Sequence, residues 1–131
     1  MSAIDLVRRA YADYGAAGPL QANPRWWHES LELDEGSAFP DGTVVRGRAA
    51  VARRLQDRHA ISGGTALRVI ALTDLGGGQV LAHLRMQARG RASGLVMPFD
   101  WWHVLTVRDD QIVRVRDFAD RDSAVAAVAG P

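Results

Sequence analysis

Residues 99–120 read FDWWHVLTVRDDQIVRVRDFAD and decide the fold of this chain. Both halves of the segment are rich in β-branched and aromatic residues that alternate with polar ones, which is typical of strands. Asp109-Asp110 lies between the two halves, so the pattern predicts a β-hairpin that turns near these residues. The length of the turn then decides which side chains share a face, because side chains alternate along a strand.

Two turn lengths give two registers for this hairpin. A two-residue loop pairs His103 with Arg116, whereas a three-residue loop, Arg108 to Asp110, pairs His103 with Val115 and Val107 with Gln111. We favour the three-residue loop because it collects the apolar side chains on one face. That face then holds Trp101, His103, Leu105, Val107, Val113, Val115 and Asp117, and the opposite face holds Asp100, Thr106, Arg114 and Arg116. His103 and Asp117 are polar groups on a face predicted to be buried, and such groups need a partner or a function.

Composition excludes several kinds of chemistry. The chain has 131 residues, a formal net charge of +1 and no cysteine, and all 16 of its basic residues are arginine. Lysine Schiff-base chemistry, thiol catalysis and disulfides are therefore excluded. The small net charge favours neither nucleic acid nor a membrane surface as a partner. No apolar run is long enough to span a membrane and no signal peptide is recognisable, so we expect a cytoplasmic protein. The four histidines lack metal-ligand spacing, and we expect neither a metal nor a cofactor.

The expected elements predict a single α+β domain over residues 1–131. Ser2 is suited to cap a first helix, whose apolar stripe carries Tyr11. The further expected helices are 23–27, 48–60 and 120–129, and the expected strands are 31–35, 65–73, 80–89, 95–107 and 111–118. Short links make the later strands antiparallel neighbours, and Pro98 should mark an edge or a bulge. Helices that cover one face of a curved sheet would form a cone with an apolar interior.

This order of elements resembles a known superfamily, and two motifs strengthen the resemblance. The motifs are Arg46-Gly47-Arg48-Ala49-Ala50-Val51, at the start of a predicted helix, and the segment from His103 to Ala127. The whole chain is similar to the nuclear transport factor 2-like superfamily, and in particular to its SnoaL-like branch of polyketide cyclases and relatives. The resemblance implies a cone-shaped α+β barrel in which a curved mixed or antiparallel sheet wraps around helices. It also implies a homodimer through the outer sheet face, where Trp102, Val104 and Phe118 are expected.

The same resemblance suggests site residues by position. Limonene-epoxide hydrolases carry a catalytic aspartate that corresponds to Asp117, although their second acidic residue has no counterpart near His83-Leu84-Arg85. Ketosteroid isomerases carry an oxyanion-binding tyrosine that corresponds to Tyr11, seven residues before Gly18. Their second oxyanion donor corresponds to His103, and their general base falls near Glu35. SnoaL-type cyclases use an aspartate that corresponds to Asp117 or Asp120.

The hypothesis from these residues is cofactor-independent acid/base catalysis. A buried carboxyl group with a histidine and a tyrosine nearby could enolise a ketone, or catalyse an aldol cyclisation or a dehydration. We expect catalysis by Asp117 with His103 as its partner, and binding of a small hydrophobic carbonyl or polycyclic compound by Tyr11, Trp101, Glu35 and Trp27. The superfamily also contains proteins without known catalysis, so a non-catalytic hydrophobic pocket and an epoxide hydrolase-like enzyme with an incomplete triad remain alternatives.

Several of these residues also have a purely structural interpretation. Asp120 precedes a predicted helix and is suited to cap it. Asp117 could pair with an arginine across the sheet, and His103 and Tyr11 could be ordinary core residues. His83 and Arg85 share a strand face that is either a polar outer face or a second wall of the pocket. The sequence alone leaves these alternatives open.

Overall fold

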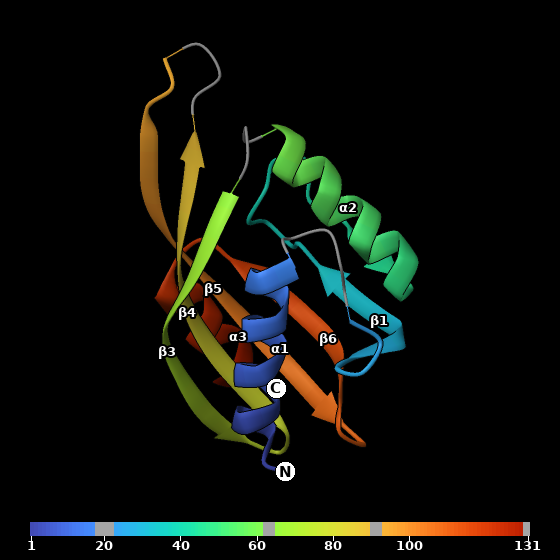
Figure 1. Ribbon diagram of the computed structural model, residues 1–131. Coiled ribbons are helices and arrows are strands. Elements are labelled where there is room, and N and C mark those ends of the chain that lie inside the picture. Colours follow the sequence, from blue (N-terminus) through green and yellow to red (C-terminus); the bar gives the residue numbers. More distant parts are fainter. Residues whose placement is uncertain (18–22, 62–64, 90–92, 130–131) are drawn as a thin grey trace.

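The structure is a computed structural model that describes residues 1–17, 23–61, 65–89 and 93–129 (Figure 1). Its elements are α1 (Ala3–Ala17), β1 (Trp27–Asp34), β2 (Val44–Arg46), α2 (Arg48–Ile61), β3 (Thr65–Gly76), β4 (Gln79–Arg89), β5 (Val96–Arg108), β6 (Gln111–Phe118) and α3 (Arg121–Ala129). Gly18, which entered the comparison with ketosteroid isomerases, lies outside the described residues. The predicted α+β class is confirmed. Among the described residues no helix is long and apolar enough to cross a membrane.

In the described residues, one curved sheet of six strands forms the body of the domain, in the order β2-β1-β6-β5-β4-β3. The meander from β3 to β6 is antiparallel as predicted, but β1 joins it parallel to β6. β2 was not predicted from the sequence; it pairs with the end of β1 and forms one edge of the sheet. The first half of β5, which includes Pro98, pairs with β4 alone. Pro98 therefore lies on an open edge, where its missing N–H costs no ladder bond.

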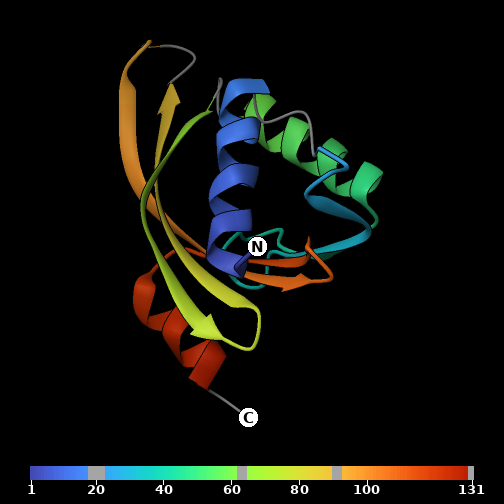
Figure 2. The same ribbon diagram turned by 60° about the horizontal axis from the view of Figure 1, so that its bottom comes forward.

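The helices lie on both faces of the sheet, which corrects the expectation that they cover only one. In Figure 2, α1 lies inside the concave face, whereas α3 lies against the outside of the sheet. Side chains of α1 and the inner sheet face form the main core, with Leu6, Val7, Leu84, Leu105 and Ile112 fully buried. A smaller apolar cluster joins α3 to the outer face.

This outer cluster involves the residues expected at a dimer contact. Val104 is fully buried with Ala124 of α3, and Trp102 and Phe118 pack against the same cluster. Part of the outer face is thus already covered by the chain's own last helix. α3 begins with a cap from Asp120, which accepts hydrogen bonds from the backbone N–H and the hydroxyl of Ser123. These two bonds hold the pKa of Asp120 below its usual value. The structural interpretation of Asp120 as a helix cap is therefore confirmed.

The register of the β5–β6 hairpin differs from both alternatives considered. The turn has two residues, Asp109 and Asp110, both with positive φ (50° and 60°), as in the turns that suit the twist of a hairpin. Beyond the turn a bulge adds one residue to β6, so that Val107 pairs with Ile112 but Thr106 with Arg114. His103 therefore pairs with Asp117 and not with Val115.

The residues predicted for the inner face are nevertheless mostly correct, although the predicted register is wrong. The observed pairing is displaced by two residues from the favoured one, and a shift of two keeps every side chain on the same face. Leu105, Val115 and Asp117 are buried as expected. Val113 is the exception: it is the extra residue of the bulge, and Ile112 lies opposite Val107 in place of the predicted Gln111.

The predicted short helix at Asn23–Trp27 is wrong. Residues 24–26 form a single turn, and strand β1 begins at Trp27. Asn23 does act as a local cap, since its side chain accepts a hydrogen bond from the N–H of Arg25 at 3.0 Å. The chain leaves the turn because Trp27 joins the sheet opposite Ile112. A tertiary pairing thus overrides a local helix-start signal.

Candidate functional site

His103 and Asp117 are direct partners across β5 and β6, and their side chains meet on the inner face of the sheet. His103 Nε2 lies 2.9 Å from Asp117 Oδ1. Both side chains are well shielded, with 16% and 7% of their surface exposed. The strands place the two groups, because directly paired residues of an antiparallel sheet have adjacent Cβ atoms.

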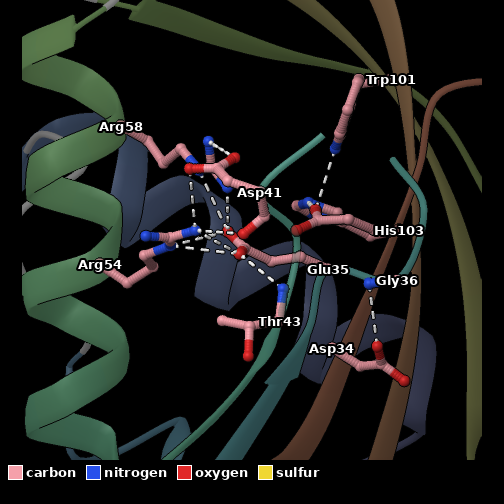
Figure 3. Close-up of polar contacts among 10 residues, drawn as sticks. Asp34, Glu35, Gly36, Asp41, Thr43, Arg54, Arg58, Trp101 and His103 are labelled. Atoms are coloured by element: carbon pink, nitrogen blue, oxygen red, sulfur yellow. Dashed lines mark hydrogen bonds and ion pairs between the residues drawn. The ribbon is translucent and has the colours of Figure 1, made fainter. Parts of the chain in front are cut away.

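Two further side chains complete a hydrogen-bonded chain through this pair. The hydroxyl of Tyr11, on α1, lies 2.7 Å from His103 Nδ1. The indole Nε1–H of Trp101 donates to Asp117 Oδ1 at 2.9 Å (Figure 3). Four of the six residues expected at the site from the sequence are therefore in contact: Tyr11, His103, Asp117 and Trp101. Tyr11, which comes from the far end of the chain, reaches the hairpin because α1 packs inside the sheet.

The hydrogen bonds define the tautomer of His103 once Asp117 is ionised. A carboxylate can only accept hydrogen bonds, so Nε2 of His103 carries the proton that is shared with Asp117. In a neutral imidazole Nδ1 is then an acceptor, and the Tyr11 hydroxyl donates to it. The arrangement is a tyrosine–histidine–carboxylate chain in which the carboxylate holds the orientation of the ring.

An apolar cavity of about 40 Å³ lies at the Tyr11 end of this hydrogen-bonded series of side chains. Tyr11, Trp27 and His103 line it together with aliphatic side chains of β1, α2, β3 and β6. Trp27 is therefore at the cavity, as expected. Its indole Nε1–H is buried and has no hydrogen-bond partner among the described residues. Since no Asp, Glu or Arg is among the described residues that line the cavity, it suits an uncharged apolar molecule.

Asp117 itself lines a different space. A more polar groove of about 250 Å³ runs between the loop after β1 and the junction of β6 with α3. Asp34, Asp117 and Asp120 line it, together with Arg116 and residues 36–38. Asp34 forms an ion pair with Arg114 at 3.2 Å, and Asp120 accepts a hydrogen bond from the N–H of Ser123 as the cap of α3. His103 thus contacts the apolar cavity, whereas the exposed part of Asp117 lies in the polar groove.

Glu35 is held in an ion-pair cluster away from the cavity. Its carboxylate is 1% exposed and binds Arg54 at 2.8 Å and Arg58 at 3.1 Å, both from α2. It also accepts a hydrogen bond from the N–H of Thr43. The two arginines reach Asp41 as well. The Arg58 hydrogen bond holds the pKa of Asp41 below its usual value, and the bond to Glu35 raises that of Arg54. Glu35 does not line the cavity expected to bind substrate.

His83 and Arg85 lie on the outer sheet face, which resolves the alternative left open by the sequence. Both contact Asp100, at 3.2 Å and 2.8 Å, and the His83 ring is stacked on Trp102. Hydrogen bonds from Arg85 and His83 lower the pKa of Asp100. A second wall of the pocket made by these residues is therefore excluded.

Two residues near the site were not found from the sequence. Phe39, in the loop between β1 and β2, lies against Trp101 with 5.1 Å between ring centroids. Arg58 places its guanidinium 3.6 Å from the centre of the Phe39 ring. The only sequence signal was a lone aromatic residue in a polar, glycine-containing loop, which does not by itself predict what it contacts.

Residues 7–115 match the SnoaL-like domain family, and the chain belongs to this family. Solved structures of similar fold include TerC co-crystallised with polyporic acid, with a TM-score of 0.75 and 18% identity over 98% of both chains. An NTF2-like protein from Burkholderia thailandensis has a TM-score of 0.76 and 23% identity over 100% of this chain and 99% of its own.

A Mycobacterium tuberculosis protein in complex with estradiol-17β-hemisuccinate has a TM-score of 0.68 and 12% identity, over 93% of this chain and 97% of its own. At these identities the structures demonstrate a common fold. No curated protein sequence matches the chain significantly.

Proposed function

We propose that the protein binds a small, uncharged hydrophobic carbonyl compound on the inner face of the sheet and transfers a proton to and from it. The observation that carries the proposal is the hydrogen-bonded chain from Tyr11 through His103 to Asp117 at the wall of an apolar cavity. Two relatives of the same fold have structures with polyporic acid and a steroid hemisuccinate, which supports a hydrophobic organic ligand.

The geometry favours His103 as the group that meets the ligand. The sequence hypothesis assigned the acid/base role to Asp117, but of the two only His103 lines the apolar cavity. Asp117 then acts as a positioning residue that orients the ring and stabilises its protonated form. A ligand carbonyl would take the Tyr11 hydroxyl as a donor, which would free His103 Nδ1 to accept a proton from the adjacent carbon.

The size of the cavity requires a movement before most ligands can bind. At about 40 Å³ it is smaller than the roughly 300–1,000 Å³ of most ligand pockets. α2 forms one wall through Val51 and Leu55 and packs mainly against β1 and β2. We expect outward movement of this helix to enlarge the cavity.

The test is exchange of ketone α-hydrogens for deuterium in D₂O, followed by ¹H NMR. Butanone, cyclohexanone and 2-tetralone form a size series, and imidazole at equal concentration is the reference catalyst. We expect exchange above the reference, and a loss of about 10²- to 10⁴-fold in His103→Asn, as is usual for removal of a general base. Asp117→Asn and Tyr11→Phe should also be slowed. His83→Asn, on the outer face, is the matched control and should match the wild type. Equal rates in wild type and His103→Asn would refute the proposal.

A second candidate is ligand binding without catalysis. The observation in its favour is that both ring nitrogens of His103 already have partners within the protein, so neither is free until Tyr11 moves. Ketones that shift the amide resonances around the cavity but exchange no faster than with imidazole would support binding alone.

We further propose a homodimer through the part of the outer face that α3 leaves uncovered. This surface carries the stacked His83 and Trp102 and the Arg85–Asp100 ion pair. Sedimentation of the wild type and of Arg85→Glu tests it, since a dimer that uses this surface should dissociate when the charge is reversed.

A further inference from the structure

Trp101 has an unusual place in the candidate site because it shares an acceptor with His103. Its indole Nε1–H and His103 Nε2 both contact the same oxygen, Oδ1 of Asp117, at 2.9 Å each. Two groups that meet at one oxygen restrict rotation of the carboxylate more than one would. The orientation of the Trp101 ring therefore helps to fix the position of the Asp117 carboxylate that His103 contacts.

The Trp101 ring contacts the loop between β1 and β2, and it also meets Phe99 of its own strand edge-on, with 6.2 Å between ring centroids. Phe39 of this loop packs on the Trp101 ring at 5.1 Å with an interplanar angle of 46°. The loop is internally bonded, with Glu35 and Thr43 joined across its base and Gly42 bonded to the carbonyl of Phe39. Phe39 is thus carried by a structured loop at a set distance from Trp101.

Arg58 of α2 holds this loop in two ways. Its guanidinium lies over the Phe39 ring at 3.6 Å, and it also binds Glu35 at 3.1 Å and Asp41 at 3.0 Å. Figure 3 shows Arg54 and Arg58 reaching from α2 to the same two carboxylates. Within the described part of the chain, only Arg58 is stacked on Phe39. Arg54 instead donates a hydrogen bond to the backbone carbonyl of Asp41 at 3.2 Å.

We propose that Phe39 and Arg58 are positioning residues for the His103–Asp117 pair and act on it through Trp101. The proposal rests on the function proposed above, and it assigns a purpose to the buried Glu35 cluster. The cluster fixes the loop, the loop presents Phe39, and Phe39 keeps Trp101 bonded to Asp117. Since α2 also forms a wall of the cavity, a movement of α2 that admits a ligand would at the same time loosen the hold on the carboxylate.

The test uses the indole N–H signals of the four tryptophans in the ligand-free protein, with the Trp101 signal identified from Trp101→Phe. In Phe39→Ala we expect solvent exchange of the Trp101 indole hydrogen to rise by about two- to tenfold, the usual worth of one aromatic pair. Its proton resonance should also move upfield as the bond to Asp117 weakens. Phe39→Leu, which keeps an apolar side chain of similar bulk, should recover part of the effect.

Arg58→Lys and Arg54→Lys form a matched pair. Each loses planar contacts to Glu35, but only Arg58→Lys loses the flat stack on Phe39. We expect faster Trp101 exchange in Arg58→Lys than in Arg54→Lys, because both variants weaken the hold on the loop but only the first also removes the stack on Phe39. The indole N–H of Trp26 is the internal reference, because it donates to Asp13 and not to a residue of the loop. Its solvent exchange should not change.

Three results would overturn the inference: an unchanged Trp101 signal in Phe39→Ala, equal effects of the two lysine variants, or a parallel rise at Trp26, which would indicate general loosening. These signals need no ligand, so they decide the inference even if the protein does not catalyse ketone exchange. If it does, Phe39→Ala and Arg58→Lys should slow that exchange more than Arg54→Lys does.

Discussion

Glu35→Gln distinguishes the two roles considered for Glu35, which are substrate binding and structural support through ion pairs with Arg54 and Arg58. In the structure this carboxylate is 1% exposed and contacts the guanidinium groups of Arg54 and Arg58. Glutamine keeps the shape but removes the charge, and it turns an N–H₂ group toward the guanidinium donors. A structural role therefore predicts a clear loss of stability, whereas a role in substrate binding alone predicts little.

The expected loss of unfolding free energy in Glu35→Gln follows from the burial of Glu35 and the partial exposure of its two arginine partners. Breaking a buried ion pair costs about 3–5 kcal/mol when the remaining charge is left without compensation. Here the arginine side chains are 25% and 21% exposed and keep Asp41 as a partner, so we expect a smaller loss of about 2–3 kcal/mol. An unfolding entropy of about 2.1 cal/mol/K per residue over 131 residues converts this into a Tm lower by about 7–11 °C.

Urea unfolding followed by circular dichroism at neutral pH measures this loss. Glu32→Gln is the matched control, because Glu32 pairs with the exposed side chains of Arg46 and Arg114. Such surface pairs contribute at most about 1 kcal/mol. If Glu35→Gln proves no less stable than Glu32→Gln, the ion-pair cluster does not stabilise the loop, and Glu35 regains its place as a candidate acid or base.

Three smaller changes test other parts of the structure. Trp26→Phe should destabilise the protein more than Trp27→Phe by about 1 kcal/mol, because only Trp26 loses a hydrogen bond, to Asp13; equal urea midpoints would contradict the assigned bonds. Asp110→Gly should raise Tm, since the residue has a φ of 60° and glycine adopts this conformation without strain; a lower Tm would argue against the two-residue turn. Asp120→Ala should lower Tm at neutral pH. Because the folded-state pKa of Asp120 is depressed, its contribution is present above the unfolded value of about 3.9 and is lost as the pH falls through the folded value. The difference from wild type should therefore shrink in acid, and a constant difference would refute the cap.

The candidate site could be predicted in part because strand alternation is a local property. Side chains two residues apart share a face whatever the pairing, so His103 and Asp117 were assigned correctly to the inner face although the register was wrong. The bulge that makes them direct partners inserts Val113, and nothing in the local pattern distinguishes that residue from its β-branched neighbours.

Glu35 could not be placed correctly from the sequence because its partners are distant. Arg54 and Arg58 follow it by 19 and 23 residues and reach it only when α2 lies beside the end of β1. Phe39 was overlooked for the same reason, since its contact with Trp101 joins a loop to a strand of the meander. Long-range electrostatic and aromatic contacts of this kind have no periodic signature.

The sequence by itself determined the elements that depend on neighbouring residues: the cap at Ser2, the helix after Gly47, the antiparallel meander and the alternation that buries His103. The tertiary structure decided the parallel pairing of β1 with β6, the place of α3 on the outer face and the meeting of Tyr11 with His103. The physical reason is that local propensities act within a few residues along the chain. Contacts between residues as far apart as Tyr11 and His103 depend instead on how the helices and the sheet bury their apolar faces together.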